Sequence, residues 1–165
     1  MIESDRHDNT GKLLPGTVGA SAMQRQWIGL SVSGDEVAVE LLPSPPSPSA
    51  PSYLQSLDLE LSFLRRGQEA TETFSAEEMT RNFLKAFNGV VVAVDAIMVF
   101  EFHGLNLKAA VKALSTLELA DEQKRGMPTQ RSPDHDRMGI IMDKTDITFM
   151  KAGDSPIKIK SSSNK

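Results

Sequence analysis

Hydrophobic and polar residues alternate from position 56 to position 63, and this is the clearest pattern in the chain. The side chains of a strand point alternately to its two faces, so a period of two predicts a strand with one buried and one wet face. The buried face would carry Leu57, Leu59, Leu61 and Phe63. A shorter alternation over residues 36–42, after a turn at Gly34 and Asp35, predicts another half-buried strand.

A helical period follows the long alternating segment. Ser75 and Glu78 have the spacing of a capping box, and Gly89 can end a helix in the left-handed conformation. Between these signals, apolar residues recur on one helical face: Ala76, Met79, Phe83, Ala86 and Phe87. The pattern predicts a helix that packs on a sheet through one apolar stripe.

Further strands are predicted after this helix. Residues 90–94 and 97–103 flank a short turn at Asp95 and Ala96, which favours a hairpin. Residues 105–119 have a helix-forming composition, yet every odd position from 105 to 111 is apolar, and we expect a strand there.

The closing part of the chain also has strand patterns. Residues 120–137 carry eight charges, two prolines and a glycine, which favours a solvated loop. Residues 140–142 and 147–150 then predict a closing hairpin, and Ile157 with Ile159 give the last strand signal.

The domain organisation is marked by a segment rich in proline and serine. Residues 43–52 hold five prolines and four serines, which favours an extended linker. We expect a first lobe over 1–42, a second lobe over 53–160, and the start of another linker at 161–165. The second lobe would be α+β, with one helix packed on a mainly antiparallel sheet.

Composition and charge exclude several classes of function. The net charge of −4 disfavours a general nucleic-acid surface, which needs a basic excess. There is no run of 18 apolar residues and no apolar leader, so we expect neither membrane insertion nor export. The sequence has no cysteine, which excludes disulfides and thiolate metal sites and fits a cytoplasmic protein.

Catalytic and metal-binding motifs are incomplete. Gly11 and Lys12 are followed by leucine, without the upstream glycine of a P-loop, so we expect no nucleotide or other cofactor. Ser31 lacks the second glycine of a nucleophile elbow, and His103 has no nucleophile near it in sequence. The run 134–136, Asp-His-Asp, has no further ligand at metal spacing. We therefore expect no catalytic residue and no metal site.

Several segments resemble the amino-terminal domain of the vesicle-fusing AAA ATPases, the family of the N-ethylmaleimide-sensitive fusion protein. They are LLPGTVGASAMQRQWIGLSV from Leu13, FLRR at 63–66, FLKAFN at 83–88, VFEFHG at 99–104 and GIIMDKTDITF at 139–149. The resemblance extends from about residue 14 to nearly the end of the chain. It implies two lobes, a double-psi β-barrel and then a small α/β lobe, with no catalytic site in either.

The resemblance also implies a binding partner and site residues. In that family, the groove between the lobes takes the acidic carboxy-terminal region of the SNAP adaptor, which brings SNARE complexes to the ATPase. The matching basic positions here are Arg25, Arg65 and Arg66. Taken alone, Arg25 would more readily stack beside Trp27, and the arginine pair would be a solvated strand end. With the resemblance, an adaptor site is favoured, on a cytoplasmic protein held at vesicle and Golgi membranes through its adaptor.

The chain departs from the family pattern at both ends. The family's first strands would precede Met1, so we expect an incomplete barrel, and the hexamer-forming ATPase modules are absent from the sequence. A truncated remnant without a working groove is therefore an alternative. Another alternative is the amino domain of a different AAA protein with a different cofactor, and a hydrolase using Ser31 and His103 is disfavoured.

Overall fold

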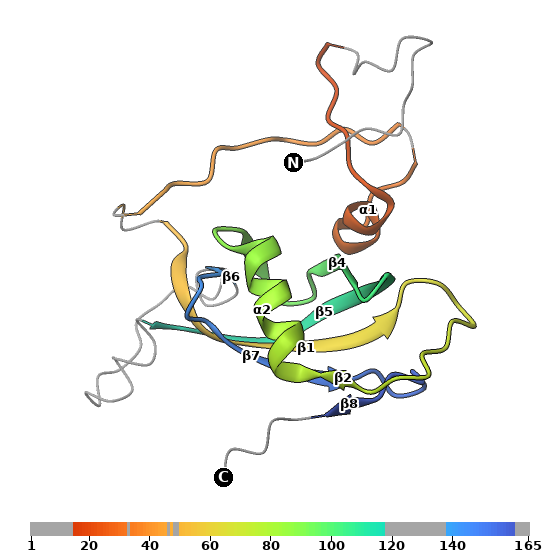
Figure 1. The fold of residues 1–165 in the computed structure, drawn as a ribbon. Helices are drawn as coiled ribbons and strands as arrows, with labels where there is room; N and C mark the ends of the chain where they lie inside the picture. Colours follow the sequence, from red (N-terminus) through yellow and green to blue (C-terminus); the bar gives the residue numbers. More distant parts are fainter. Residues whose placement is uncertain (1–14, 33, 46, 48–49, 118–137, 161–165) are drawn as a thin grey trace. The chain divides into compact units, whose positions relative to one another are not determined.

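The computed structural model describes residues 15–32, 34–45, 47, 50–117 and 138–160, and the structural statements below concern these residues. The chain divides into two compact units, Met1–Glu40 and Leu41–Lys165. The described part of the first unit contains the helix α1 (Ala22–Ile28). The second unit contains the helix α2 (Ala76–Phe87) and eight strands (Figure 1). The strands are β1 (Ser52–Phe63), β2 (Phe74–Ser75), β3 (Val91–Ala93), β4 (Ile97–Phe102), β5 (Leu105–Thr116), β6 (Met138–Ile140), β7 (Asp146–Lys151) and β8 (Ile159–Lys160).

The long strand β1 is the centre of the main sheet. The strand order is β3-β6-β1-β5-β4, and β7 also pairs with β1. β5 lies antiparallel to β1, whereas β6 and β7 lie parallel to it along successive stretches. β2 and β8 form a separate parallel pair. Within the main sheet three of the five strand pairings are antiparallel and two are parallel, so the sheet is mixed with a majority of antiparallel pairings.

Both predicted hairpins are wrong, although their strands exist. β3 pairs with β6, and β4 pairs with β5 across the turn at His103 and Gly104. After β3 the chain turns toward β5, where the Asp95 N–H donates to the Val111 carbonyl at 2.9 Å. β6 and β7 each pair with β1 instead of with each other. An alternating pattern predicts which face of a strand is buried, but it does not predict which strand pairs with it.

The core of the second unit lies between α2 and one face of the sheet (Figure 1). Ser75 caps α2, since its hydroxyl accepts from the Glu78 N–H, and Gly89 beyond the helix has φ +82°. Met79 and Phe83 are fully buried, as the apolar stripe predicts, whereas Ala86 is exposed. The rings of Phe74 and Phe102 meet edge to face at 5.3 Å where the helix begins. The α+β class is therefore confirmed.

The first unit differs from the expectation of strands. α1 has a reciprocal capping box between Ser21 and Gln24, and it ends at Gly29 in the left-handed conformation. Residues 36–42 form no strand, and Val39 and Leu41 are largely exposed. A strand needs a neighbour to satisfy its backbone groups, and none pairs with this segment in the described part of the chain. The double-psi architecture of this lobe thus stays a prediction.

Neither α1 nor α2, the two helices that the structure describes, has the length and apolar content needed to cross a bilayer.

Candidate functional site

A hollow of about 460 Å³ lies at the end of β1. Two segments form its wall, the end of β1 with the turn that follows it, and the turn after β7. Its lining residues are Ser62, Phe63, Arg65, Arg66, Gly67, Gln68, Ala152, Gly153, Asp154, Ser155 and Pro156. The hollow belongs entirely to the second unit.

Parallel pairing brings these two segments together. β1 and β7 run in the same direction, so both end at the same side of the sheet, with Lys151 beside Leu61. The Ala152 N–H donates to the Leu61 carbonyl at 2.9 Å and continues the ladder beyond β7. Gly67 then turns the chain with φ +74°, a conformation that glycine adopts without strain. Arg65 and Arg66 thereby become part of the lining of the hollow.

The electrostatics of the hollow favour an acidic ligand. The Arg65 and Arg66 side chains are exposed, and neither forms an ion pair with any residue of the described part of the chain. Asp154 is the single acidic residue in the lining. A guanidinium group presents a fixed fork of donors that can bind both oxygens of a carboxylate. The structure therefore places two guanidinium groups, those of Arg65 and Arg66, on one concave surface.

The third predicted residue, Arg25, lies in α1 of the first unit. Its Nη1 donates to the Ala20 carbonyl at 2.8 Å, and the side chain is half-buried. Arg65 and Arg66 share one hollow, whereas Arg25 belongs to the other unit, so its place in the same binding groove stays a prediction. The helix α1 was not predicted from the sequence, although Ser21, Gln24 and Gly29 carry the start and stop signals of a helix.

His103 is held by two carboxylates. Its Nδ1 lies 3.2 Å from Glu72 Oε1 and its Nε2 lies 3.0 Å from Glu78 Oε1. The ring stacks on Phe102 with centroids 4.1 Å apart. The hydrogen bonds to Glu78 and then Glu72 raise the pKa of His103 above its usual value. Both ring nitrogens are engaged, so this arrangement stabilises the imidazolium and leaves no nitrogen open to act as a base toward a substrate.

The contacts of His103 with Glu72 and Glu78 predict that the stability of the fold depends on pH. A raised folded-state pKa means that the stabilisation is fully present below the unfolded pKa and is lost as the pH rises through the folded pKa. We expect the unfolding free energy of the chain to fall as the pH rises above 6.5, the ordinary pKa of histidine, measured by urea denaturation. The fall should be smaller in His103→Asn, because asparagine tolerates the φ of +50° but does not titrate. An unfolding free energy that changes equally with pH in the wild type and in His103→Asn would contradict this role of His103.

The other candidate residues show no catalytic arrangement. The Ser31 hydroxyl donates to Asp35 Oδ2 at 2.8 Å, and the Ser31 N–H donates to the same oxygen at 2.6 Å. These bonds lower the pKa of Asp35 and stabilise a local turn. Residues 134–136 lie outside the described residues. Within residues 15–117 and 138–160, apart from the undescribed positions, no three potential metal ligands cluster.

Comparison with known proteins supports the resemblance. No protein-family model matches the chain. It is 29% identical to the vesicular-fusion protein Sec18 of Schizosaccharomyces pombe over 89% of its own length, and 27% identical to vesicular-fusion protein SEC18 of Saccharomyces cerevisiae over 99%. The chain spans about a fifth of these relatives, 18% and 21% of their lengths. Its homologues are thus the Sec18/NSF vesicular-fusion proteins, which match it along nearly the whole chain.

Proposed function

We propose that this chain is the adaptor-binding amino-terminal domain of a vesicle-fusing ATPase. It would recruit the SNAP adaptor and, through it, the SNARE complexes that the whole protein disassembles. The observation that carries the proposal is the pair of exposed arginines, Arg65 and Arg66, in the hollow at the end of β1. The family resemblance assigns these same two positions to the adaptor site.

The chemistry of the hollow suits an acidic protein segment. Exposed guanidinium groups attract a carboxylate-rich chain at a distance, and they pair with individual carboxylates when the chain docks. Such binding is screened by salt, which suits a partner that must be released again. Arg25 of the first unit would supply a third cation, and the first lobe would have the double-psi architecture of the family.

The proposal assigns binding to this chain and ATP hydrolysis to other modules of the complete protein. We therefore expect that nucleotide neither binds the chain nor raises its melting temperature. The place of action would be the cytoplasmic side of vesicle and Golgi membranes, reached through the adaptor.

Charge reversal of the arginine pair tests the proposal. We expect Arg65→Glu with Arg66→Glu to weaken binding to SNAP assembled on SNAREs by about 2 kcal/mol or more, roughly thirtyfold, because both cations become repulsive. The titration is carried out at low and high salt, and the wild-type affinity should fall as salt rises.

A matched control distinguishes an effect of the binding site from an effect of the net charge of the chain. Lys85→Glu with Lys144→Glu makes the same change in net charge at two exposed positions outside the hollow, and it should leave the affinity nearly unchanged. An unaffected Arg65 and Arg66 double variant would remove these residues from the site. A wild-type chain that is folded in its second unit but binds no adaptor would favour the truncated remnant.

A further inference from the structure

The outer edge of β7 has no partner strand in the described part of the chain. β7 pairs with β1 alone. Because the Ala152 N–H donates to β1, the even-numbered residues of β7 direct their backbone groups toward β1, and the odd-numbered ones direct theirs away. The N–H and C=O groups of Ile147, Phe149 and Lys151 therefore form an open ladder edge.

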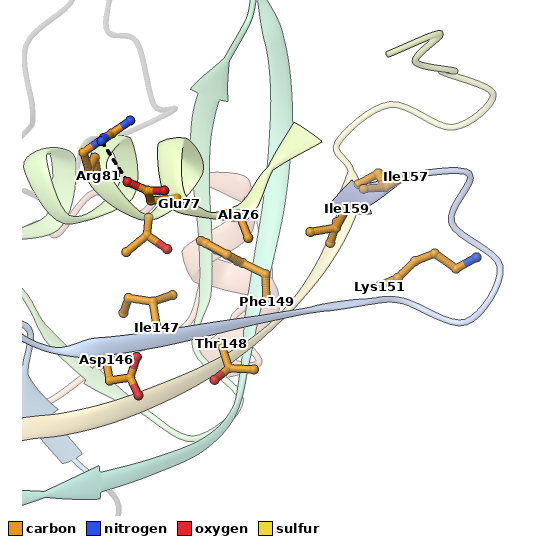
Figure 2. A pocket seen from close by; sticks show the side chains of 11 residues that line it. Ala76, Glu77, Arg81, Asp146, Ile147, Thr148, Phe149, Lys151, Ile157 and Ile159 are labelled. Carbon is orange, nitrogen blue, oxygen red and sulfur yellow. Dashed lines mark hydrogen bonds and ion pairs between the residues drawn. The ribbon is translucent and has the colours of Figure 1, made fainter. Parts of the chain in front are cut away.

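A hollow of about 630 Å³ runs along this edge between α2, β7 and β8. Figure 2 shows Phe149 on the side of β7 that faces α2, and Thr148 on the opposite side. The apolar part of the lining consists of Ala76, Ile147, Phe149, Ile157 and Ile159. None of the residues around this hollow lines the hollow that holds Arg65 and Arg66. The two hollows therefore share no lining residue, although their linings adjoin in the chain at residues 151–152 and 156–157.

The charges around the hollow are asymmetric. Glu77 and Arg81 neutralise each other at 3.2 Å on α2, as Figure 2 shows, and the acidic Asp146 lies at the start of β7 on the face opposite Phe149. Lys151 lies at the end of the edge on the same face of β7 as Phe149, is exposed, and forms no ion pair with a described residue. An incoming chain would therefore meet an apolar wall along β7 and a cation at the Lys151 end.

We propose that the β7 edge binds an extended peptide as an added strand, with apolar side chains at alternate positions and an acidic side chain beside Lys151. The open N–H and C=O groups supply the backbone pairing in this mode of recognition. Alternate side chains of the peptide then point into the hollow, because successive residues of a strand face opposite sides. This inference goes beyond the proposed function, since it adds a second binding surface to the same unit.

The test uses a capped nonapeptide with the sequence TETVTVTET. Threonine occupies the odd positions, and glutamate, valine, valine and glutamate occupy the even ones. Its symmetry places a glutamate beside Lys151 in either strand direction. We expect bound peptide to slow amide hydrogen exchange at Ile147, Phe149 and Lys151 of the full chain, as followed by NMR. Thr148 and Met150 should change little, because their N–H groups already belong to the ladder with β1.

Two charge variants test the acidic preference. Lys151→Glu should weaken binding of the glutamate peptide about tenfold and favour a peptide with lysines in place of the glutamates. Met150→Glu adds a negative charge to the opposite face of the same strand and should leave both affinities nearly unchanged.

Three results would overturn the proposal. The first is no binding at about 1 mM peptide, where even a weak peptide complex is populated. The second is binding without added protection at Ile147 and Phe149. The third is protection of these amides in the free chain, which would mean that the chain itself covers the edge, or that a second copy does if the protection rises with concentration.

Discussion

Replacing Phe83 with alanine is expected to destabilise the second unit by about 3 to 5 kcal/mol. The side chain is fully buried on the sheet-facing side of α2. Its ring meets Phe100 edge to face at 5.5 Å and Phe149 at 6.1 Å, so it joins the helix to two different strands. Truncation removes this contact and leaves a cavity that strands of a paired sheet cannot readily close.

Urea denaturation followed by circular dichroism measures the loss for Phe83→Ala. The neighbouring substitution Asn82→Ala serves as the control, because the Asn82 side chain is exposed. Its effect should stay within about 0.5 kcal/mol. A loss below about 1 kcal/mol for Phe83→Ala would mean that α2 presents another face to the sheet.

Replacing Leu59 with alanine is expected to cost about 2 to 5 kcal/mol. Leu59 is fully buried in the middle of β1 and lies beside Val111 of β5 and Phe149 of β7. Both neighbouring strands lose packing against this side chain, so the effect should reach the whole sheet. Native-state hydrogen exchange of β5 and β7 should show the same loss as global denaturation.

The adjacent residue Glu60 provides the control for Leu59. Its side chain faces the other side of the sheet and forms a partly exposed ion pair with Lys112 at 3.3 Å. Glu60→Ala should cost less than about 1 kcal/mol, because exposed ion pairs contribute little. A larger effect at Glu60 than at Leu59 would mean that the register of β1 is shifted by one residue.

The sequence predicted the elements of the second unit well. The alternation over 56–63, the Ser75 cap of α2 with its buried Met79 and Phe83, and the odd apolar positions from Leu105 to Val111 all correspond to observed elements. These signals are local, since they depend on the period of side-chain directions and on helix ends. Strand partners depend on contacts between distant segments, so β3 and β4 were paired wrongly.

The candidate site could not be predicted from the local pattern of hydrophobic and polar residues alone. Arg65 and Arg66 were assigned through the family resemblance, and the turn after β7 that completes their hollow lies some ninety residues further along the chain. The partners of His103 are likewise 31 and 25 residues away, at Glu72 and Glu78. No periodicity connects such positions. By contrast, the missed helix α1 carried its own local signals, which the alternation after it obscured.

The position of β1 in the sheet also determines when this unit can fold during synthesis. β1 is the first strand of the unit to be made, yet its partners follow much later, with Leu57 paired to Leu114 on one side and to Ile147 on the other. Contacts of such high sequence separation slow folding, because long loops must close before any pairing stabilises them. A nascent chain that ends before residue 146 leaves most of one edge of β1 open, with its leucines exposed to chaperones or to other chains. We therefore expect cooperative folding only after β7 has emerged from the ribosome.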